Sequence, residues 1–278
     1  MFFEDLKNRT VAITGGAGVI GQALTQGLAS AGMNVAILDV NDSKARNQAK
    51  ALARKHGVRS AGILCDVLDR SSIEKARETL VRTFGQLDFL INGAGGNSSD
   101  ATTEIEQAGT KPAGLEGSFF DIKEDAFRRT LDLNLLGTVF PSQILGQLLV
   151  SQGKGAILNI SSMNAYRPLT KVPAYSAAKC AVSNFTEWLA VHLAQTGVRV
   201  NAIAPGFFLT EQLKFLAYDE KGELTDRYRR VLKLTPMHRF GDREELVGPT
   251  LFLLSRLSGF VTGVIIPVDG GFNAYSGV

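Results

Sequence analysis

The sequence predicts an α/β fold in which a doubly wound parallel sheet of about seven strands carries helices on both faces. Short apolar runs alternate with amphipathic stretches along 278 residues of balanced composition, 45% hydrophobic and 21% charged. Strands that are apolar on both faces and alternate with helices form a parallel sheet covered on each side. The expected strands are Thr10–Thr14, Asn34–Asp39, Ser60–Cys65, Leu87–Asn92, Gly155–Ser161, Arg199–Ala204 and Val264–Val268, and the expected helices include Ile20–Ala31, Ser43–His56, Ser71–Phe84 and Arg243–Ser255.

Two connections are much longer than the others. No repeat, proline-rich linker or low-complexity block marks a boundary, so we expect one Rossmann-type domain over residues 1–278. The long connections are Gly96–Asp121 and Phe207–Asp242, and both follow strand ends, where a doubly wound sheet places its ligand crevice. We expect residues 207–242 to form a substrate lid; for the first segment, a tolerated surface insertion is the alternative.

Composition excludes several classes of function. The net charge is +3 with acidic and basic residues interleaved, so nothing favours a nucleic-acid partner. Two cysteines and three scattered histidines give no metal-ligand spacing. The first ten residues carry Glu4 and Asp5 and lack the apolar run of a signal peptide, and no uncharged apolar stretch reaches about 18 residues. We therefore expect a cytoplasmic protein without a membrane partner.

A glycine-rich turn follows the first strand and leads directly into a helical pattern. It runs TGGAGVIG over residues 14–21 and contains Gly15, Gly18, Val19, Ile20 and Gly21. Glycines permit a tight turn and let the backbone approach a pyrophosphate, which then faces the N–H groups and positive dipole of the helix start. Glycine clusters also mark ordinary turns, but the strand–turn–helix context predicts a dinucleotide site.

The second strand ends on an acidic residue, Asp39, roughly 20 residues after the glycines. A carboxylate there accepts hydrogen bonds from the adenine ribose hydroxyls and repels a 2′-phosphate. Val40 and Asn41 follow, with no adjacent Arg or Lys, so we expect NAD(H) in preference to NADP(H). As an alternative, Asp39 could cap the next helix, although Asp42 and Ser43 are better placed to do so.

A second constellation lies around the fifth strand. Ser162 follows this strand, and Tyr175 and Lys179 stand four residues apart, on one face of a helix. An ammonium group beside a phenol favours the phenolate and lowers its pKa from about 10. Ser162 could hydrogen-bond the same reacting oxygen. An acid/base group and a polarising donor at one oxygen are what a hydride-transfer site needs.

Together these motifs resemble the short-chain dehydrogenase/reductase family, single-domain type, across essentially the whole chain. The resemblance implies a catalytic triad of Ser162, Tyr175 and Lys179, with Tyr175 and Lys179 also binding the cofactor. It implies that Asn134, in the run 132–137, is a fourth catalytic residue, in a region that holds a water linking Lys179 to solvent. Pro141 indicates a local kink in the same helix.

Three further segments resemble cofactor-binding segments of the family. Residues 92–95, NGAG, resemble an Asn-Asn-Ala-Gly turn that supports the sheet and passes beneath the adenosine ribose. Residues 65–67 resemble the adenine segment, and residues 205–210 resemble the nicotinamide side, where the Phe208 backbone and the Thr210 hydroxyl would hold the carboxamide. Val19 departs from the usual glycine of single-domain members, and the spacing resembles that of the extended members; we interpret the turn as a variant. The implied contacts are Asp66, Val67, Asn92, Gly93, Ala94, Pro205, Gly206, Phe208 and Thr210.

The substrate side has a polar, cationic rim. It comprises Asn97, Asn164, Arg167, Lys171 and the pair His238-Arg239. A steroid or long acyl chain would require an apolar slot, whereas an arginine that pairs bidentately with a carboxylate suits a hydroxy acid. We expect Ser162, Asn164, Arg167 and Tyr175 to contact the substrate; a solvated arginine or a salt bridge is the alternative for Arg167.

A narrower resemblance concerns the substrate. The run 167–170, the long lid and residues 268–278 are similar to those of D-mannonate oxidoreductases (fructuronate reductases) of this family. The implied reaction is reduction of the ketone of D-fructuronate by NADH to give D-mannonate, and the reverse. The alternatives are a reductase of another sugar ketone or of a 3-oxoacyl thioester, and a dinucleotide-sensing binding protein. The presence of both Tyr175 and Lys179 disfavours the sensor.

The helix that carries Tyr175 is apolar around most of its circumference. Between Cys180 and Gln195 it has one charged side chain, Glu187, apart from His192. A helix that is apolar around most of its circumference is buried on both sides, and we expect the sheet on one side and another subunit on the other. The resemblance implies that this helix and the Asn134 helix pair between subunits in dimers or tetramers. We therefore expect a homo-oligomer, such as a homotetramer. A covering loop of the same chain is the alternative.

Overall fold

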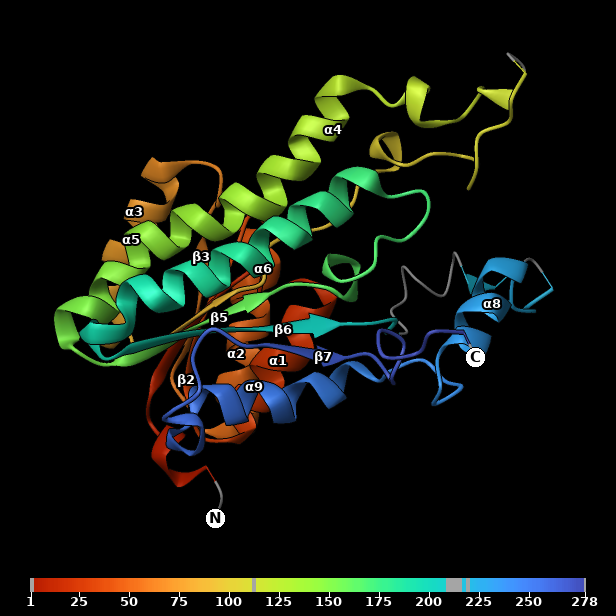
Figure 1. Cartoon of the computed structure of the whole chain (residues 1–278). Helices are drawn as coiled ribbons and strands as arrows, with labels where there is room; N and C mark the ends of the chain where they lie inside the picture. The colour runs from red at the N-terminus through yellow and green to blue at the C-terminus, as the bar shows by residue number, and fades with distance from the viewer. Residues whose placement is uncertain (1–2, 112–113, 209–216, 219–220, 278) are drawn as a thin grey trace.

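Seven parallel strands form one sheet in the order β3-β2-β1-β4-β5-β6-β7, with helices on both faces (Figure 1). The computed structural model describes residues 3–111, 114–208, 217–218 and 221–277. The expected doubly wound parallel sheet is confirmed; β1 and β2 have the expected bounds, and the ends of the other strands differ from expectation by one or two residues. The strands are β1 (Thr10–Thr14), β2 (Asn34–Asp39), β3 (Ser60–Leu64), β4 (Phe89–Asn92), β5 (Gly155–Ile160), β6 (Val198–Pro205) and β7 (Ile265–Val268).

Alternate residues of each central strand pack on opposite faces of the sheet. In β1, Val11 and Ile13 belong to one buried apolar cluster and Ala12 to the other; in β4, Ile91 and Leu90 divide in the same way. Both faces therefore bury apolar side chains, which explains why the strands are continuous apolar runs. Burial of this surface is the main stabilising contribution of the fold.

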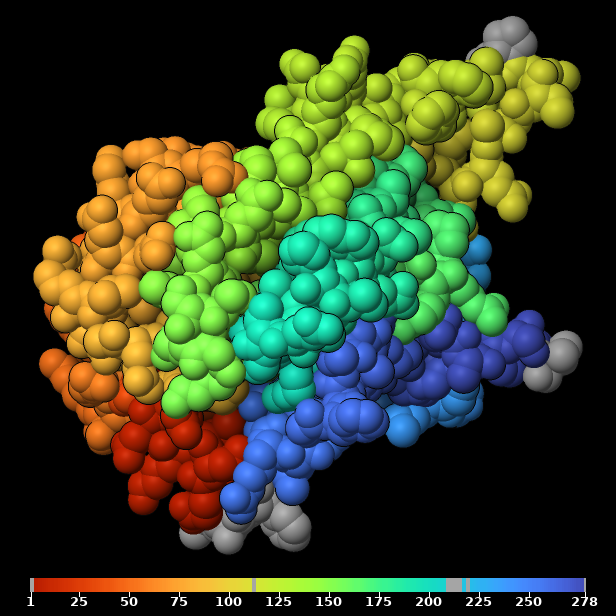
Figure 2. Space-filling model, turned by 60° about the vertical axis from the view of Figure 1, so that its left-hand side comes forward, coloured from red at the N-terminus to blue at the C-terminus, as the bar shows by residue number. Residues whose placement is uncertain are grey.

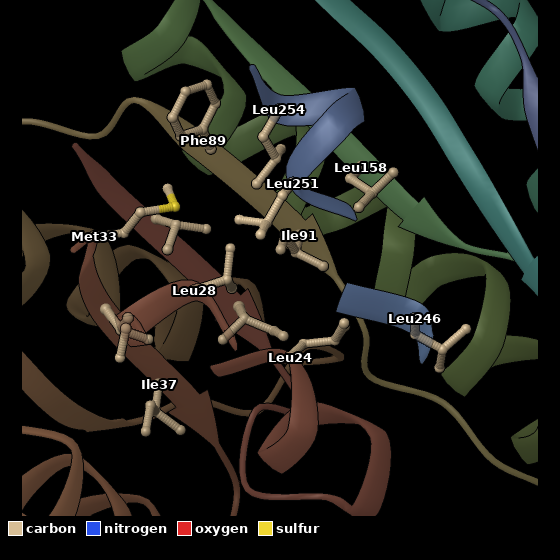
Figure 3. Packing of buried hydrophobic residues seen from close by; sticks show 14 of the residues in the cluster. Leu24, Leu28, Met33, Ile37, Phe89, Ile91, Leu158, Leu246, Leu251 and Leu254 are labelled. Carbon is tan, nitrogen blue, oxygen red and sulfur yellow. The ribbon is translucent and has the colours of Figure 1, made fainter. Parts of the chain in front are cut away.

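Two helical layers cover the sheet. One holds α1 (Val19–Ser30), α2 (Asp42–His56) and α9 (Val247–Leu254); the other holds α3 (Arg70–Phe84), α4 (Glu124–Leu131), α5 (Gly137–Gln152) and α6 (Pro173–Leu193). Figure 3 shows the first layer from close by, where Leu24 and Leu28 of α1 and Leu251 of α9 pack over Ile91 and Leu158 of the sheet. The expected helix Arg243–Ser255 is divided into a 3₁₀ turn, Arg243–Leu246, and α9.

The strand order reverses between β1 and β4: β1 to β3 extend towards one edge of the sheet, and β4 to β7 extend towards the other. These strands are neighbours, with Thr14 opposite Asn92 at their carboxyl ends. In an open parallel sheet this reversal opens the crevice in which ligands bind. The glycine turn after β1, residues 93–96 after β4 and the loop after β5 all leave the sheet at this edge.

One long helical run spans α4 and α5 with a π-helical turn, Asp132–Leu136, between them. Asn134 lies within this turn, and Pro141 lies one turn into α5, where it removes a backbone donor. The irregularity expected near Asn134 is therefore present. The run Glu124–Gln152 is also long and apolar enough to cross a membrane by length and composition alone, which is weak evidence, and half of its most apolar window is buried inside the fold.

Candidate active site

The glycine turn is shaped by two close backbone approaches. Gly15 has φ +62°, and a Cβ at this position would lie 2.8 Å from the Cα of Ala94. At Gly21 a Cβ would collide with the carbonyl of Gly15, so α1 packs directly against the turn. Gly18 caps the helix in extended conformation, and α1 begins at Val19. Only glycine permits this left-handed turn and these separations.

A pocket of about 510 Å³ opens beside this turn. The first three N–H groups of an α-helix have no partner within the helix, and here Val19, Ile20 and Gly21 carry them along the pocket wall. The Val19 departure therefore leaves the pyrophosphate-type turn in place. The lining residues are Gly15, Gly18, Val19, Ile20, Gly21, Asp39, Val40, Lys44, Cys65, Asp66, Val67, Gly93, Ala94, Gly95 and Leu133.

Asp39 ties the end of β2 to the glycine turn. Its Oδ2 accepts a hydrogen bond from the Ala17 N–H at 3.0 Å, and its Oδ1 accepts one from the Asn41 N–H at 2.9 Å. The cap of α2 is Asn41, whose side chain accepts from the Lys44 N–H. The alternative that Asp39 caps this helix is wrong, as is the expectation that Asp42 or Ser43 is better placed; Asp42 is already the first helical residue.

Lys44 is a pocket residue that sequence reasoning missed. It follows Asp39 by five positions and lies in the first turn of α2, on the wall of the pocket that Asp39 lines. The expectation that no cation lies near Asp39 rested only on the adjacent residues Val40 and Asn41. Placing the start of the helix at Asp42 would have shown that Lys44 returns to the same side.

The turn after β4 divides its residues between the pocket and the core. Gly93 and Ala94 line the pocket, and their N–H groups donate to Thr14 Oγ1 at 3.1 and 3.2 Å. Asn92 instead turns inward, where its Nδ2 donates to Ser142 Oγ and Asn159 Oδ1, both at 2.8 Å. Asn92 thus joins β4 to β5 and α5, which agrees with the sheet-supporting role that the resemblance implies.

The end of β6 carries the expected nicotinamide-side segment. Pro205 is the last residue of the strand, and Gly206 lies so close to Asp269 that a Cβ there would be 2.6 Å from the Asp269 Cβ. Phe208 is buried and bridges Gly241. Thr210 lies outside the described residues.

Three of the four expected catalytic side chains meet at the carboxyl end of β5. Ser162 follows this strand, and α6 presents Tyr175 and Lys179 on one face. Lys179 Nζ lies 5.6 Å from the centre of the Tyr175 ring and donates to the Ile160 carbonyl at 2.7 Å. Ser162 Oγ accepts from the Asn164 N–H at 3.2 Å, which leaves its own proton for another acceptor.

Burial dominates the electrostatics of this cluster. It raises the pKa of Tyr175, and a hydrogen bond with Ser162 opposes the rise only in part. The expected lowering of the phenol pKa by Lys179 is not observed; burial raises it because desolvation penalises the phenolate. Burial also lowers the pKa of Lys179 to about 8. The phenol is a proton donor at neutral pH, which suits reduction of a carbonyl.

Asn134 completes the cluster from the π-helical turn. Its buried side chain donates to the Gly96 and Thr130 carbonyls at 2.7 and 2.8 Å and accepts from the Gly96 N–H at 3.2 Å. A Cβ at Gly95 would lie 2.6 Å from Asn134 Oδ1 and 3.3 Å from Lys179 Nζ. Gly95 therefore lies beside both Asn134 and Lys179, and the site has no room for a side chain at this position.

The expected substrate side chains have different surroundings. Asn164 is buried, with its Nδ2 donating to Ser176 Oγ at 3.3 Å. Arg167 is exposed and makes no ion pair with any residue that the structure describes, so the salt-bridge alternative finds no partner there. Arg239 is paired in bidentate fashion with Glu245, at 2.6 and 2.7 Å, and holds the pKa of that carboxyl at about 2. It is thus not an open cation of the rim.

The outer face of α6 is bare in the described part of the chain. Trp188 and Val191 are 58% and 80% exposed, and Figure 2 shows α5 (lime green) and α6 (teal) at the surface with nothing in front of them. A groove of about 550 Å³ runs between the two helices. No described loop covers this face, contrary to the alternative of a covering loop.

The glycine turn, the pocket and the Ser–Tyr–Lys cluster define a nicotinamide-dependent dehydrogenase/reductase. The family model for enoyl-(acyl carrier protein) reductase, a short-chain dehydrogenase/reductase model, matches residues 15–273. The chain belongs to the short-chain dehydrogenase/reductase family and is an oxidoreductase.

Particular relatives cover almost the whole chain. The uncharacterized oxidoreductase UxuB of Bacillus subtilis is 49% identical over 99% of this chain and 98% of its own length. An uncharacterized oxidoreductase of Haemophilus influenzae is 44% identical over 99% of this chain and 96% of its own. A solved structure of a proposed D-mannonate oxidoreductase from Haemophilus influenza with bound NAD superposes with a TM-score of 0.94 at 44% identity and covers 100% of both chains.

Proposed function

We propose that this enzyme reduces the ketone of D-fructuronate with NADH to give D-mannonate, and catalyses the reverse. One observation carries the choice of substrate: the exposed Arg167 guanidinium, without an ion pair among the described residues, stands on the loop that joins Ser162 to Tyr175. A uronate places a carboxylate on the same small molecule as its reacting ketone, and a planar guanidinium binds a carboxylate through two parallel hydrogen bonds. Similarity to the proposed D-mannonate oxidoreductase supports the same substrate.

The residues of the pocket fit a dinucleotide. Bound there, the nicotinamide would donate or accept the hydride. The glycine turn would hold the pyrophosphate on the N–H groups of Val19, Ile20 and Gly21, while Asp66 and Val67 line the part of the pocket expected for adenine. Pro205, Gly206 and Phe208 would border the nicotinamide.

Proton transfer falls to the cluster on α6. Tyr175, whose pKa is raised by burial, would donate its proton to the oxygen of the former ketone during reduction. Ser162 would donate a hydrogen bond to that same oxygen, since the bond that its Oγ accepts from the Asn164 N–H does not use its own proton. Lys179 would bind the nicotinamide ribose, and Asn134 would hold residues 95–96 beside it.

We propose NAD(H) as the preferred cofactor, because Asp39 lines the pocket where a 2′-phosphate would bring further negative charge. Lys44 on the same wall reduces that repulsion without removing it. We propose in addition that a second copy of the chain covers α5 and α6, so that the enzyme is a homodimer or homotetramer of the cytoplasm. Trp188 supports this, since aromatic side chains are typical of interface cores.

The test is oxidation of NADH by the purified enzyme with D-fructuronate. NADPH and D-tagaturonate serve as parallel controls of cofactor and of substrate. We expect fast turnover of fructuronate with NADH and at least tenfold lower kcat/KM with NADPH, since about 1.4 kcal/mol of repulsion is enough for a factor of ten. Turnover of neither uronate, with NADH still bound tightly, would contradict the substrate and leave the enzyme class intact.

A further inference from the structure

Helix α8 (Asp226–Leu234) lies beyond the carboxyl end of β6 (Figure 1) and is held from two directions. On one side Tyr228 is buried, with its ring 6.3 Å from the ring of Phe207 and 6.1 Å from that of Phe240. Phe207 follows the Pro205-Gly206 segment expected at the nicotinamide. This aromatic contact fixes α8 to the cofactor side of the site.

The other side of α8 is held by charge. Arg227 Nη1 donates to Glu106 Oε1 at 2.7 Å, and Arg230 Nη2 donates to the same oxygen at 2.9 Å. Arg227 also donates to Thr170, through Nη1 to Oγ1 at 2.9 Å and through Nη2 to the carbonyl at 3.2 Å. Arg227 thus joins three segments: the long connection after β4, α8, and the loop between Ser162 and Tyr175.

The connection after β4 is itself attached to that loop by backbone. The Thr103 N–H donates to the Lys171 carbonyl at 2.9 Å, three residues before Glu106. The segment that carries Glu106 is therefore anchored to the Ser162–Tyr175 loop, and the Glu106 carboxylate orients Arg227 towards Thr170. Desolvation raises the pKa of Glu106, but the hydrogen bonds and charges of the two arginines outweigh it, so the net pKa is lowered and the group is ionised at neutral pH.

We propose that Glu106 is a positioning residue for the carbonyl substrate, acting through Arg227 to hold α8 against the Ser162–Tyr175 loop. This rests on the reduction of a carbonyl substrate proposed above. The side chains of Arg227 and Glu106 are 29% and 27% exposed, so water and salt weaken the pair but do not remove it. Because α8 is already ordered before the substrate binds, substrate binding does not carry the entropic cost of ordering this helix.

The pair of variants Glu106→Ala and Glu116→Ala tests this. Glu116 is an exposed glutamate of the same connection without an ion pair among the described residues, so it is the matched control. The first measurement is hydrogen–deuterium exchange of residues 226–234 by mass spectrometry, which needs no substrate. We expect about fivefold faster exchange in Glu106→Ala, an intermediate rate in Glu106→Gln, which keeps an acceptor oxygen, and the wild-type rate in Glu116→Ala.

The second measurement is steady-state kinetics with NADH and D-fructuronate. Glu106→Ala should raise the KM of the carbonyl substrate about fivefold and leave kcat and the KM of NADH within about twofold of wild type. Equal exchange in the two alanine variants, or faster exchange with an unchanged substrate KM, would overturn the proposal. Failure of every variant to reduce fructuronate would count against the proposed substrate alone, and exchange would still decide whether Glu106 holds α8.

Discussion

Asp39 Oδ2 accepts a hydrogen bond of 3.0 Å from the backbone N–H of Ala17, which joins the acidic end of β2 to the glycine turn. The same carboxylate lines the pocket proposed for the cofactor. One side chain thus anchors the turn and, in the proposed complex, also places a negative charge beside the adenosine end of the cofactor. These actions have different consequences for NADH and NADPH, so they can be separated.

Asp39→Ala should weaken NADH binding about tenfold or more, because charged hydrogen bonds are worth about 1.5–3 kcal/mol each. NADPH should lose less affinity or gain some, since the repelling charge is gone and Lys44 remains on the pocket wall. Fluorescence titration with both nucleotides measures the two Kd values. Asp42→Ala removes an acidic group at the same end of α2 and serves as control. An equal loss for both nucleotides would mean that Asp39 only anchors the turn.

Lys179 should make stability depend on pH in an unusual direction. Burial lowers its pKa to about 8 from a reference of 10.5, so the unfolded chain binds more protons between these values. The free energy of unfolding therefore rises with pH through this window. Below pH 8, burial of the charged ammonium destabilises the fold by about 1–3 kcal/mol.

Lys179→Met removes this titration. Its Tm relative to wild type should be most favourable at pH 7 and should fall by several degrees as pH approaches 10. The Ile160 carbonyl loses its donor at every pH, so the slope, not the offset, is the readout. Lys50→Met, at an exposed position on α2, should leave the slope unchanged. Parallel melting curves for Lys179→Met and wild type across pH 7–10 would contradict the prediction.

Gly95→Ala should damage the site with only a moderate loss of stability. The new Cβ would lie 2.6 Å from Asn134 Oδ1 and 3.3 Å from Lys179 Nζ, so one or both must shift. Overpacking of this kind costs about 1–3 kcal/mol, and a shift of Lys179 should reduce kcat at least tenfold. Gly248→Ala, where a Cβ meets nothing within 4 Å, is the control. Wild-type kcat in Gly95→Ala would show that the cluster tolerates the methyl group.

The elements of this fold follow closely from local pattern. Continuous apolar runs such as 10–14 and 34–39 predicted β1 and β2 with correct bounds, because a strand buried on both faces has no polar alternation to misread. The glycine turn was also predictable, since its chemistry depends on consecutive residues. What local pattern did not predict were contacts between segments distant along the chain.

Arg227 and Glu106 show this limit in the site itself. They are 121 positions apart in the sequence. Nothing in the local pattern distinguishes either residue from an ordinary surface charge, because their contact forms only when α8 packs beside the connection after β4. Lys44 was not predicted because it is not adjacent to Asp39 in the sequence and reaches the pocket wall only through the first turn of α2. The predicted direction of the Tyr175 pKa shift was wrong, because residue spacing indicates which groups are close but not how deeply they are buried.

The α5–α6 face predicts a further result, in the oligomeric state. If a second copy covers this face, Trp188→Glu places a charge in the centre of the interface, and the assembly should dissociate to monomers in size-exclusion chromatography with light scattering. Val81→Glu, at an exposed apolar position on α3, is the matched control and should elute as wild type. A monomeric wild-type protein at micromolar concentration would refute the proposed interface.

Arg167→Met tests the substrate proposal most directly. Methionine has a similar reach without the charge, so the variant removes a bidentate, charge-assisted contact of about 1.5–3 kcal/mol if Arg167 binds the carboxylate. The KM for D-fructuronate should then rise about tenfold or more, while the KM for NADH stays near the wild-type value. Arg129→Met alters another exposed arginine, on α4, that makes no ion pair in the described part of the chain, and should have no effect on either constant. An unchanged fructuronate KM in Arg167→Met would leave Arg167 as a solvated loop residue and would remove the main structural support for a uronate, since Arg239 is neutralised by Glu245 and Arg227 is occupied by Glu106 and Thr170.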